Sequence, residues 1–123
     1  MDAMNVQLTT IIIYAKDMQR TARFYAAHFG YSTDGAVVEG LIELKPAGDG
    51  TEILIHQAAK SLKLGSAAVK LSFTVADVEL FVETAEANGL EFGPIHHANG
   101  YAFANTNDPD GNSISISSRQ LRK

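Results

Sequence analysis

One pattern occurs twice in this sequence, and it constrains the fold more than any other feature. Each copy begins with a strand-like segment, continues through an aspartate into a segment with helical spacing, and ends with three further strand-like segments. Ile11 matches Leu71 and Asp17 matches Asp77, so the copies are offset by 60 residues. Few residues are identical, which makes this a repeat of pattern. The sequence therefore predicts two consecutive β-α-β-β-β modules.

The first copy predicts a strand over residues 8–15, followed by a helix. Asp17 is a candidate N-cap, because its carboxylate can accept an amide hydrogen bond from the next turn. Gly30 is expected to end the helix, because glycine adopts positive φ readily. The expected buried helix face comprises Met18, Ala22, Tyr25 and Phe29. Further strands are expected at residues 31–33, 36–45 and 51–56.

The second copy repeats this order. Residues 68–75 predict a strand, Asp77 a second N-cap, and Gly89 the end of a second helix. Three more strands are expected at residues 90–92, 101–105 and 113–117. We expect one domain over residues 1–123, with module 1 at about 6–58 and module 2 at about 67–119.

Composition excludes several classes of function. The chain has no cysteine, which rules out disulfides, thiolate metal sites and cysteine nucleophiles. Its formal net charge is −4, and a nucleic-acid partner is not expected without a basic surface. Met1–Asn5 lacks the basic start of a targeting sequence, and the apolar run at 11–15 is far shorter than a membrane span. We expect a cytoplasmic protein with no membrane partner.

Three segments give the chain a family resemblance. Residues 10–17, followed by Arg23-Phe24-Tyr25 and Phe29-Gly30-Tyr31, match a strand, "D", "FY" and "LG-aromatic" pattern. Residues 70–77 repeat its opening, and Asp108-Pro109-Asp110-Gly111-Asn112 leads into the last strand. Together the segments resemble the vicinal oxygen chelate superfamily, which holds glyoxalase I, extradiol dioxygenases and bleomycin-resistance proteins. The resemblance implies an α+β fold of two tandem modules, whose curved mixed sheet forms a cup with helices outside.

The resemblance also implies a ligand site inside the cup and, in many relatives, a homodimer. Metal-dependent relatives place His, Gln or Glu at four cup positions, of which three correspond here to Thr10, Lys70 and Ser115. The fourth lies on residues 51–56 and could be Glu52, Ile53 or Leu54. A threonine or serine hydroxyl is a poor ligand for a divalent metal, and an ammonium would repel the ion. We therefore expect no metal cofactor, with one divalent ion as the alternative.

Strand alternation indicates which side chains can face a ligand. The candidates that could supply apolar or aromatic surface are Ile12, Tyr14, Leu54, Tyr101 and Phe103. Those that could form hydrogen bonds are Thr10, Ser72, Asn105 and Ser115, and His56 shares a strand face with Glu52. Lys70 is the one charge expected to attract an anionic group. Whether Tyr101 and Phe103 face the cup or the core stays open at this point.

Other groupings of polar residues give weaker signals. Glu43 and Glu52 could form a carboxylate pair, although solvated strand charges are the more common case. His96 and His97 could include one side chain over the cup mouth, and His28 near a helix end is expected at the surface. The sequence lacks a Gly-x-Ser-x-Gly elbow and a phosphate-binding glycine loop.

Three functions remain open. The first is a metal-independent protein that sequesters a small organic ligand, anionic or aromatic, as bleomycin-resistance proteins do. The second is a metal-dependent glyoxalase- or dioxygenase-like enzyme with non-standard ligands. The third is a dimeric scaffold with a vestigial cup.

Overall fold

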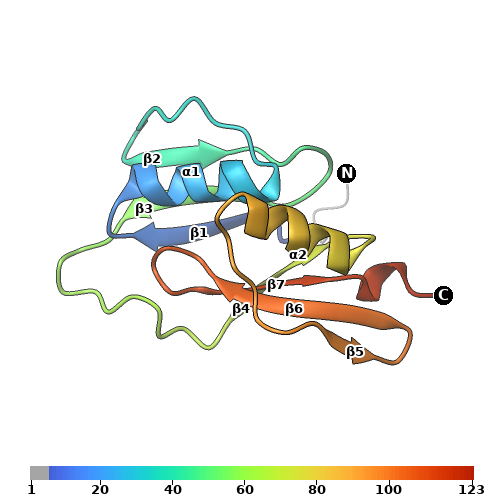
Figure 1. The fold of residues 1–123 in the computed structure, drawn as a ribbon. Helices are drawn as coiled ribbons and strands as arrows, with labels where there is room; N and C mark the ends of the chain where they lie inside the picture. The colour runs from blue at the N-terminus through green and yellow to red at the C-terminus, as the bar shows by residue number, and fades with distance from the viewer. Residues whose placement is uncertain (1–5) are drawn as a thin grey trace. The chain divides into compact units, whose positions relative to one another are not determined.

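The computed structural model describes residues 6–123, so Met1–Asn5, on which the expected lack of a targeting sequence partly rests, lies outside the described residues. The chain divides into two compact units, one ending at Leu62 and the other beginning at Lys63. Each unit contains one helix and one mixed sheet, which confirms the expected α+β class (Figure 1). Among the described residues, none forms a helix with the length and apolar character needed to cross a membrane.

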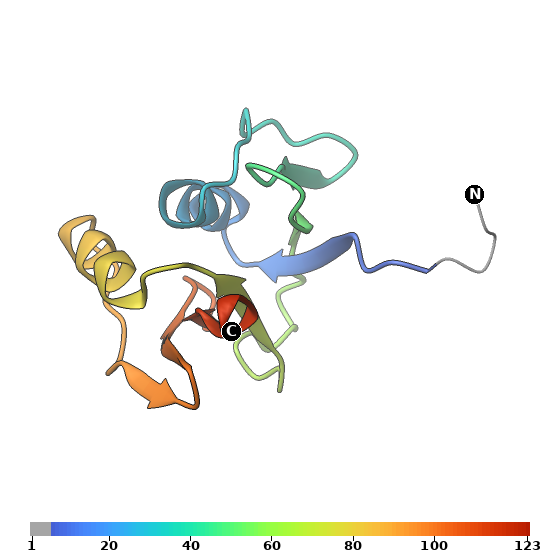
Figure 2. The same ribbon diagram turned by 90° about the vertical axis from the view of Figure 1, so that its right-hand side faces the viewer.

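The first unit packs one helix on a three-stranded sheet with the strand order β1-β3-β2. β1 (Thr10–Ala15) runs parallel to β3 (Glu52–Gln57), and β2 (Leu41–Leu44) runs antiparallel to β3. α1 (Met18–Phe29) covers one face of this sheet, as the end-on view shows (Figure 2). Ile13, Ile42, Ile53 and Ile55 fill the layer between helix and sheet and are almost fully buried.

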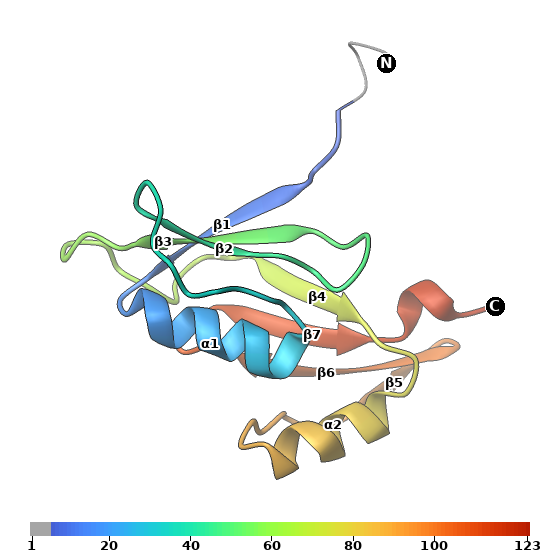
Figure 3. The same ribbon diagram turned by 90° about the horizontal axis from the view of Figure 1, so that it is seen from above.

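The second unit has the strand order β4-β7-β6-β5. β4 (Lys70–Thr74) is parallel to β7 (Ser113–Ser117), and β6 (Tyr101–Asn107) is antiparallel to both β7 and β5 (His96–Ala98). α2 (Val78–Ala87) lies along β6 (Figure 3), and a 3-10 turn, η1 (Arg119–Leu121), follows the last strand. Ala104, Ile114 and Ile116 are fully buried on the helix side.

Both predicted helix starts are confirmed. Asp17 Oδ1 accepts a hydrogen bond from the Arg20 amide at 3.1 Å, and Asp77 Oδ1 accepts one from the Leu80 amide at 3.0 Å. α1 ends at Gly30, whose φ is +73°, a conformation that glycine adopts without strain. The repeated aspartate therefore satisfies one otherwise unpaired helix amide in each unit.

Asp77→Ala is expected to lower the free energy of unfolding by about 1 kcal/mol, since it removes the N-cap hydrogen bond. Urea titration followed by far-ultraviolet circular dichroism measures the change. Asp77→Asn is the matched control, because asparagine caps helices nearly as well. Equal losses in the two variants would mean that the cap does not stabilise α2.

Three strand predictions need correction. Residues 31–33 form only an isolated bridge, in which Ser32 and Lys45 exchange two backbone hydrogen bonds of 2.9 Å. The strand expected over 36–45 shortens to β2, because the chain turns at Glu39 and Gly40, both with positive φ. Residues 90–92 are not a strand either: Leu90 is buried, and the Phe92 ring packs against Phe81 of α2. The pairing strand of the second unit is instead β5.

Candidate functional site

The candidate ligand surface of the first unit is the face of its sheet opposite α1, here called open face 1. Ile12 and Tyr14 are 51% and 45% exposed there, whereas Ile13 between them is 6% exposed. Because β1 and β3 pair in parallel, Thr10 lies beside Glu52, Ile12 beside Leu54, and Tyr14 beside His56. Open face 1 thus brings together the five first-unit residues that the sequence predicted: Thr10, Ile12, Tyr14, Leu54 and His56.

Open face 1 combines an aromatic pair with a compensated charge cluster. The rings of Tyr14 and His56 lie 4.9 Å apart between centroids. Lys45 Nζ lies 3.3 Å from Glu43 Oε1 and 3.2 Å from Glu52 Oε2. The hydrogen bonds to Glu52 and then to Glu43 raise the pKa of Lys45 above its ordinary value. The two carboxylates therefore share one cation, the Lys45 ammonium.

The second unit has a corresponding surface, open face 2, on the side of its sheet away from the buried isoleucines. Register places Ser72 beside Ser115, and Ser115 beside Asn105. Ser115 Oγ donates to Ser72 Oγ at 2.9 Å, and Lys70 Nζ donates to Asn105 Oδ1 at 3.1 Å. The structure thus places Lys70, Ser72, Asn105 and Ser115 on one face of the sheet, where Ser115 is itself buried.

The structure also answers the open question about Tyr101 and Phe103. Ala104 between Phe103 and Asn105 is fully buried on the helix side, so Tyr101 and Phe103 share open face 2 with Asn105. Phe103 stacks on His96 with ring centroids 5.0 Å apart, and Tyr101 lies 6.2 Å from Phe103. The Arg122 guanidinium lies 5.6 Å from the centre of the Tyr101 ring. These four side chains form a row of rings capped by a cation.

Several residues near open face 2 escaped the sequence prediction. A hollow of about 500 Å³ is lined by Lys70, Asn105 and Ser113 together with Glu91, Phe92, Gly93, Thr106 and Asn107. Asn107 could have been found, because it follows Asn105 at the two-residue spacing of one strand face. Glu91 and Arg122 carry no such signal, since both lie outside regular strands.

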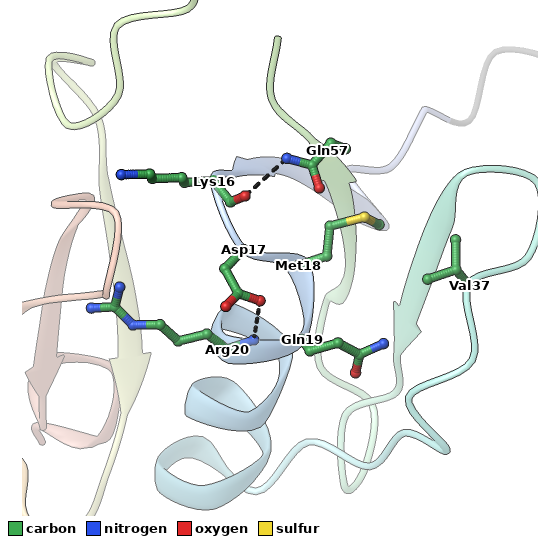
Figure 4. A pocket seen from close by; sticks show the side chains of 7 residues that line it. All are labelled: Lys16, Asp17, Met18, Gln19, Arg20, Val37 and Gln57. Carbon is green, nitrogen blue, oxygen red and sulfur yellow. Dashed lines mark hydrogen bonds between the residues drawn. The ribbon is translucent and has the colours of Figure 1, made fainter. Parts of the chain in front are cut away.

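A second hollow, of about 540 Å³, lies at the start of α1 and includes none of the predicted site residues (Figure 4). Gln57 Nε2 donates to the Lys16 carbonyl at 2.9 Å, and Asp17 caps the helix. The Gln57 amide and the Asp17 carboxylate therefore both stabilise the connection between β1 and α1.

The strand register reduces the number of candidate residues for the fourth metal-ligand position implied by the family resemblance. Ile53 is 1% exposed and faces α1, which excludes it. In the second unit Lys70 pairs with Ser113, and Ser115 lies two residues further along the strand. In the first unit Thr10 pairs with Glu52, so the residue equivalent to Ser115 is Leu54.

The side chains at these four positions do not fit a divalent metal. Thr10 and Ser115 offer neutral hydroxyls, Lys70 an ammonium and Leu54 no donor atom, whereas metal sites in proteins use imidazole, carboxylate or thiolate ligands. Glu52, on the same face, is held by Lys45. Across residues 6–123, no three His, Cys, Asp or Glu side chains gather in a way that could hold a metal ion.

Comparison with known proteins identifies one matching family and many solved structures with a similar fold. The model of the Glyoxalase/Bleomycin resistance protein/Dioxygenase superfamily matches residues 7–116. TnmS3, an antibiotic binding protein from Streptomyces sp. CB03234, has a TM-score of 0.77 at 18% identity, covering 94% of this chain and 97% of TnmS3. UcmS2 has a TM-score of 0.79 at 16% identity, with coverages of 94% and 99%.

A lactoylglutathione lyase from Agrobacterium tumefaciens has a TM-score of 0.72 at 20% identity, covering 95% of this chain and 96% of the lyase. No curated protein sequence matches the chain. At these identities the structural likeness establishes the shared fold, while binding proteins and enzymes stand side by side among the similar structures.

Proposed function

Because the chain belongs to the Glyoxalase/Bleomycin resistance protein/Dioxygenase superfamily, we propose that it binds a small organic molecule without a metal ion and sequesters it unchanged. The observation that carries this proposal is the chemistry of the four family positions. Thr10, Leu54, Lys70 and Ser115 supply hydroxyls, apolar surface and a positive charge where metal-dependent relatives carry ligands. In each unit, side chains of these types can contribute hydrogen bonds, charge or contact area to an organic ligand.

The aromatic side chains support binding in preference to a purely structural role. Tyr14 and His56 on open face 1, and Tyr101 and Phe103 on open face 2, present ring surface outside the helix-facing cores. Ring contacts contribute about 0.5–1.5 kcal/mol beyond area burial. A scaffold with a vestigial site has no use for ring surface placed among hydroxyls and charges.

The proposed location, oligomeric state and biological role are based on the family. We propose that the protein acts as a cytoplasmic homodimer and contributes to antibiotic resistance by sequestration. The family description names bleomycin resistance, and TnmS3 is an antibiotic binding protein of similar fold.

Metal content tests the proposal against the metal-dependent alternative. Protein purified without chelator is expected to contain far less than one Zn, Ni, Fe or Mn ion per chain by inductively coupled plasma mass spectrometry. The physical reason is the lack of a suitable donor set at Thr10, Leu54, Lys70 and Ser115. About one tightly held ion per chain would instead favour a glyoxalase- or dioxygenase-like enzyme.

Ligand binding supplies the second half of this test. A thermal-shift panel of aromatic and peptide-like compounds is expected to yield stabilising ligands, because binding adds RT ln(1 + [L]/Kd) to stability. The shifts should persist in EDTA. A panel without any stabilising compound would favour the scaffold function, and shifts abolished by EDTA would contradict metal independence.

A further inference from the structure

Open face 2 changes in chemical character along β6. Successive open-face residues of a strand lie about 6.6 Å apart. In β6 these residues are two aromatic side chains followed by two amides: Tyr101, Phe103, Asn105 and Asn107. On the neighbouring strand, Ser117, Ser115 and Ser113 lie beside Phe103, Asn105 and Asn107 respectively. The surface therefore has an aromatic end, a hydrogen-bonding middle, and a far end where Lys70 lies beside Ser113.

Lys70 is positioned to receive an anion. Its ammonium has three N–H donors, and one is used by Asn105 Oδ1 at 3.1 Å. Among the described residues, no carboxylate is found within ion-pair distance of Lys70. The bond to Asn105 restrains the lysine side chain toward the middle of the surface. Apart from Asn105, no described residue is seen to accept a hydrogen bond from the Lys70 ammonium, which leaves two N–H donors at the hollow for solvent or a ligand.

One acidic residue, Glu91, lines the same hollow as Lys70. Thr106 has the strand parity of buried Ala104 and faces the α2 side, where its hydroxyl donates to the Glu91 carbonyl at 2.8 Å. Glu91 and Lys70 both line the hollow, and Lys70 lies on open face 2. This arrangement favours a ligand with one negative charge, placed at Lys70 and away from Glu91.

We propose that open face 2 binds planar aromatic monocarboxylates, with the carboxylate on Lys70 and the ring against Phe103 and Tyr101. The inference rests on the proposed function, since it names the class of molecule that this binding surface takes. Phe103 and Asn105 are one strand repeat apart, about 6.6 Å. A carboxylate attached to a fused ring system can therefore reach Lys70 while its ring contacts Phe103, and Ser115 and Ser72 border the path between them.

Three probes separate recognition of the charge from recognition of the aromatic system in the 123-residue chain. 2-Naphthoate is expected to bind more tightly than neutral 2-naphthamide, and more tightly than cyclohexanecarboxylate, which keeps the charge on a smaller, non-aromatic ring. The loss of the exposed ion pair should cost about two- to fivefold in Kd, and the loss of the aromatic contact about three- to tenfold. Isothermal titration calorimetry measures the constants, and amide chemical shifts in β6 report the location.

Four variants test the assigned contacts. Lys70→Met should weaken 2-naphthoate about two- to fivefold and leave 2-naphthamide unchanged, whereas Lys63→Met, which removes an exposed lysine outside the strands, should change neither. Phe103→Leu should weaken both naphthalene probes and spare cyclohexanecarboxylate. Glu91→Gln should strengthen 2-naphthoate about twofold, because it removes the like charge.

The outcomes separate this inference from the proposed function. Equal affinity for 2-naphthoate and 2-naphthamide, or an unchanged Kd in Lys70→Met, would overturn the carboxylate assignment while leaving metal-independent binding of other molecules intact. Absence of 2-naphthoate binding at millimolar concentration would overturn it as well, even if the thermal-shift panel finds other ligands. Loss of all binding in EDTA would contradict the proposed function itself.

Discussion

Asp108→Ala is expected to lower the free energy of unfolding by about 3 kcal/mol, the larger of two effects expected in the second unit. The Asp108 carboxylate is 5% exposed and closes the turn before β7. Oδ1 accepts hydrogen bonds from the amides of Asp110 and Asn112 at 2.9 Å, and Oδ2 accepts one from Asn112 Nδ2 at 2.8 Å. Hydrogen bonds to a charged group are worth about 1.5–3 kcal/mol each, and alanine removes the acceptor of all three bonds.

Urea titration followed by circular dichroism measures this loss, and two variants control it. Asp108→Asn keeps an acceptor oxygen for the two backbone amides, so it should lose about half as much. Asp49→Ala removes an exposed carboxylate from a turn of the first unit and should change stability by less than about 0.5 kcal/mol. If Asp108→Ala proved as mild as Asp49→Ala, the Asp-Pro-Asp-Gly-Asn turn would contribute little to the fold.

This turn shows what a sequence can reveal when local chemistry fixes local structure. Asp108, Pro109 and Gly111 satisfy a tight turn through their own side chains and dihedral preferences, with Gly111 at a φ of +85°. Asp17 and Asp77 are predictable for the same reason, since each bonds an amide three residues away. In these cases the partner is close in sequence, so the pattern alone identifies it.

The strand predictions in the second unit were wrong because contacts with distant segments determine the structure there. Leu90 and Phe92 alternate like strand residues, but they are anchored by α2, where Phe92 meets Phe81 edge to face. His96 to Ala98 are all exposed, and β5 exists because β6 offers it a pairing edge. The alternation at residues 90–92 is therefore misleading, and residues 96–98 have no apolar alternation that would predict a strand.

The candidate site likewise has features that local sequence predicts and features that depend on distant segments. Alternation predicted that Ile12 and Tyr14 share one face, and that Lys70, Ser72 and Thr74 share another, because face membership needs only local parity. The bond from Lys70 to Asn105 and the stacking of His96 on Phe103 depend on register between strands distant in sequence. Glu91 and Arg122 enter the surroundings of open face 2 from loops, where parity gives no information.

Ile55→Ala is expected to cost about 3 kcal/mol of unfolding free energy, whereas Leu54→Ala in the same strand should cost less than about 1 kcal/mol. β3 is the central strand of the first unit, and Ile55 lies between Ile13 and Ile42 beneath α1, with no exposed surface. Alanine there leaves a cavity between helix and sheet. Leu54 points to open face 1, so its truncation removes surface that is already partly solvated.

The two substitutions lie at adjacent positions of β3 and remove aliphatic side chains of the same size. Comparing them by urea titration therefore tests directly which face of the sheet is the core. The same pair should behave in the opposite order toward ligands: Leu54→Ala should weaken compounds that bind open face 1, and Ile55→Ala should affect them only through stability. Equal destabilisation by both substitutions would mean that the face carrying Thr10, Ile12, Tyr14 and His56 is also packed against protein. Those residues could then form no ligand surface, and open face 2 would have to carry the binding function by itself.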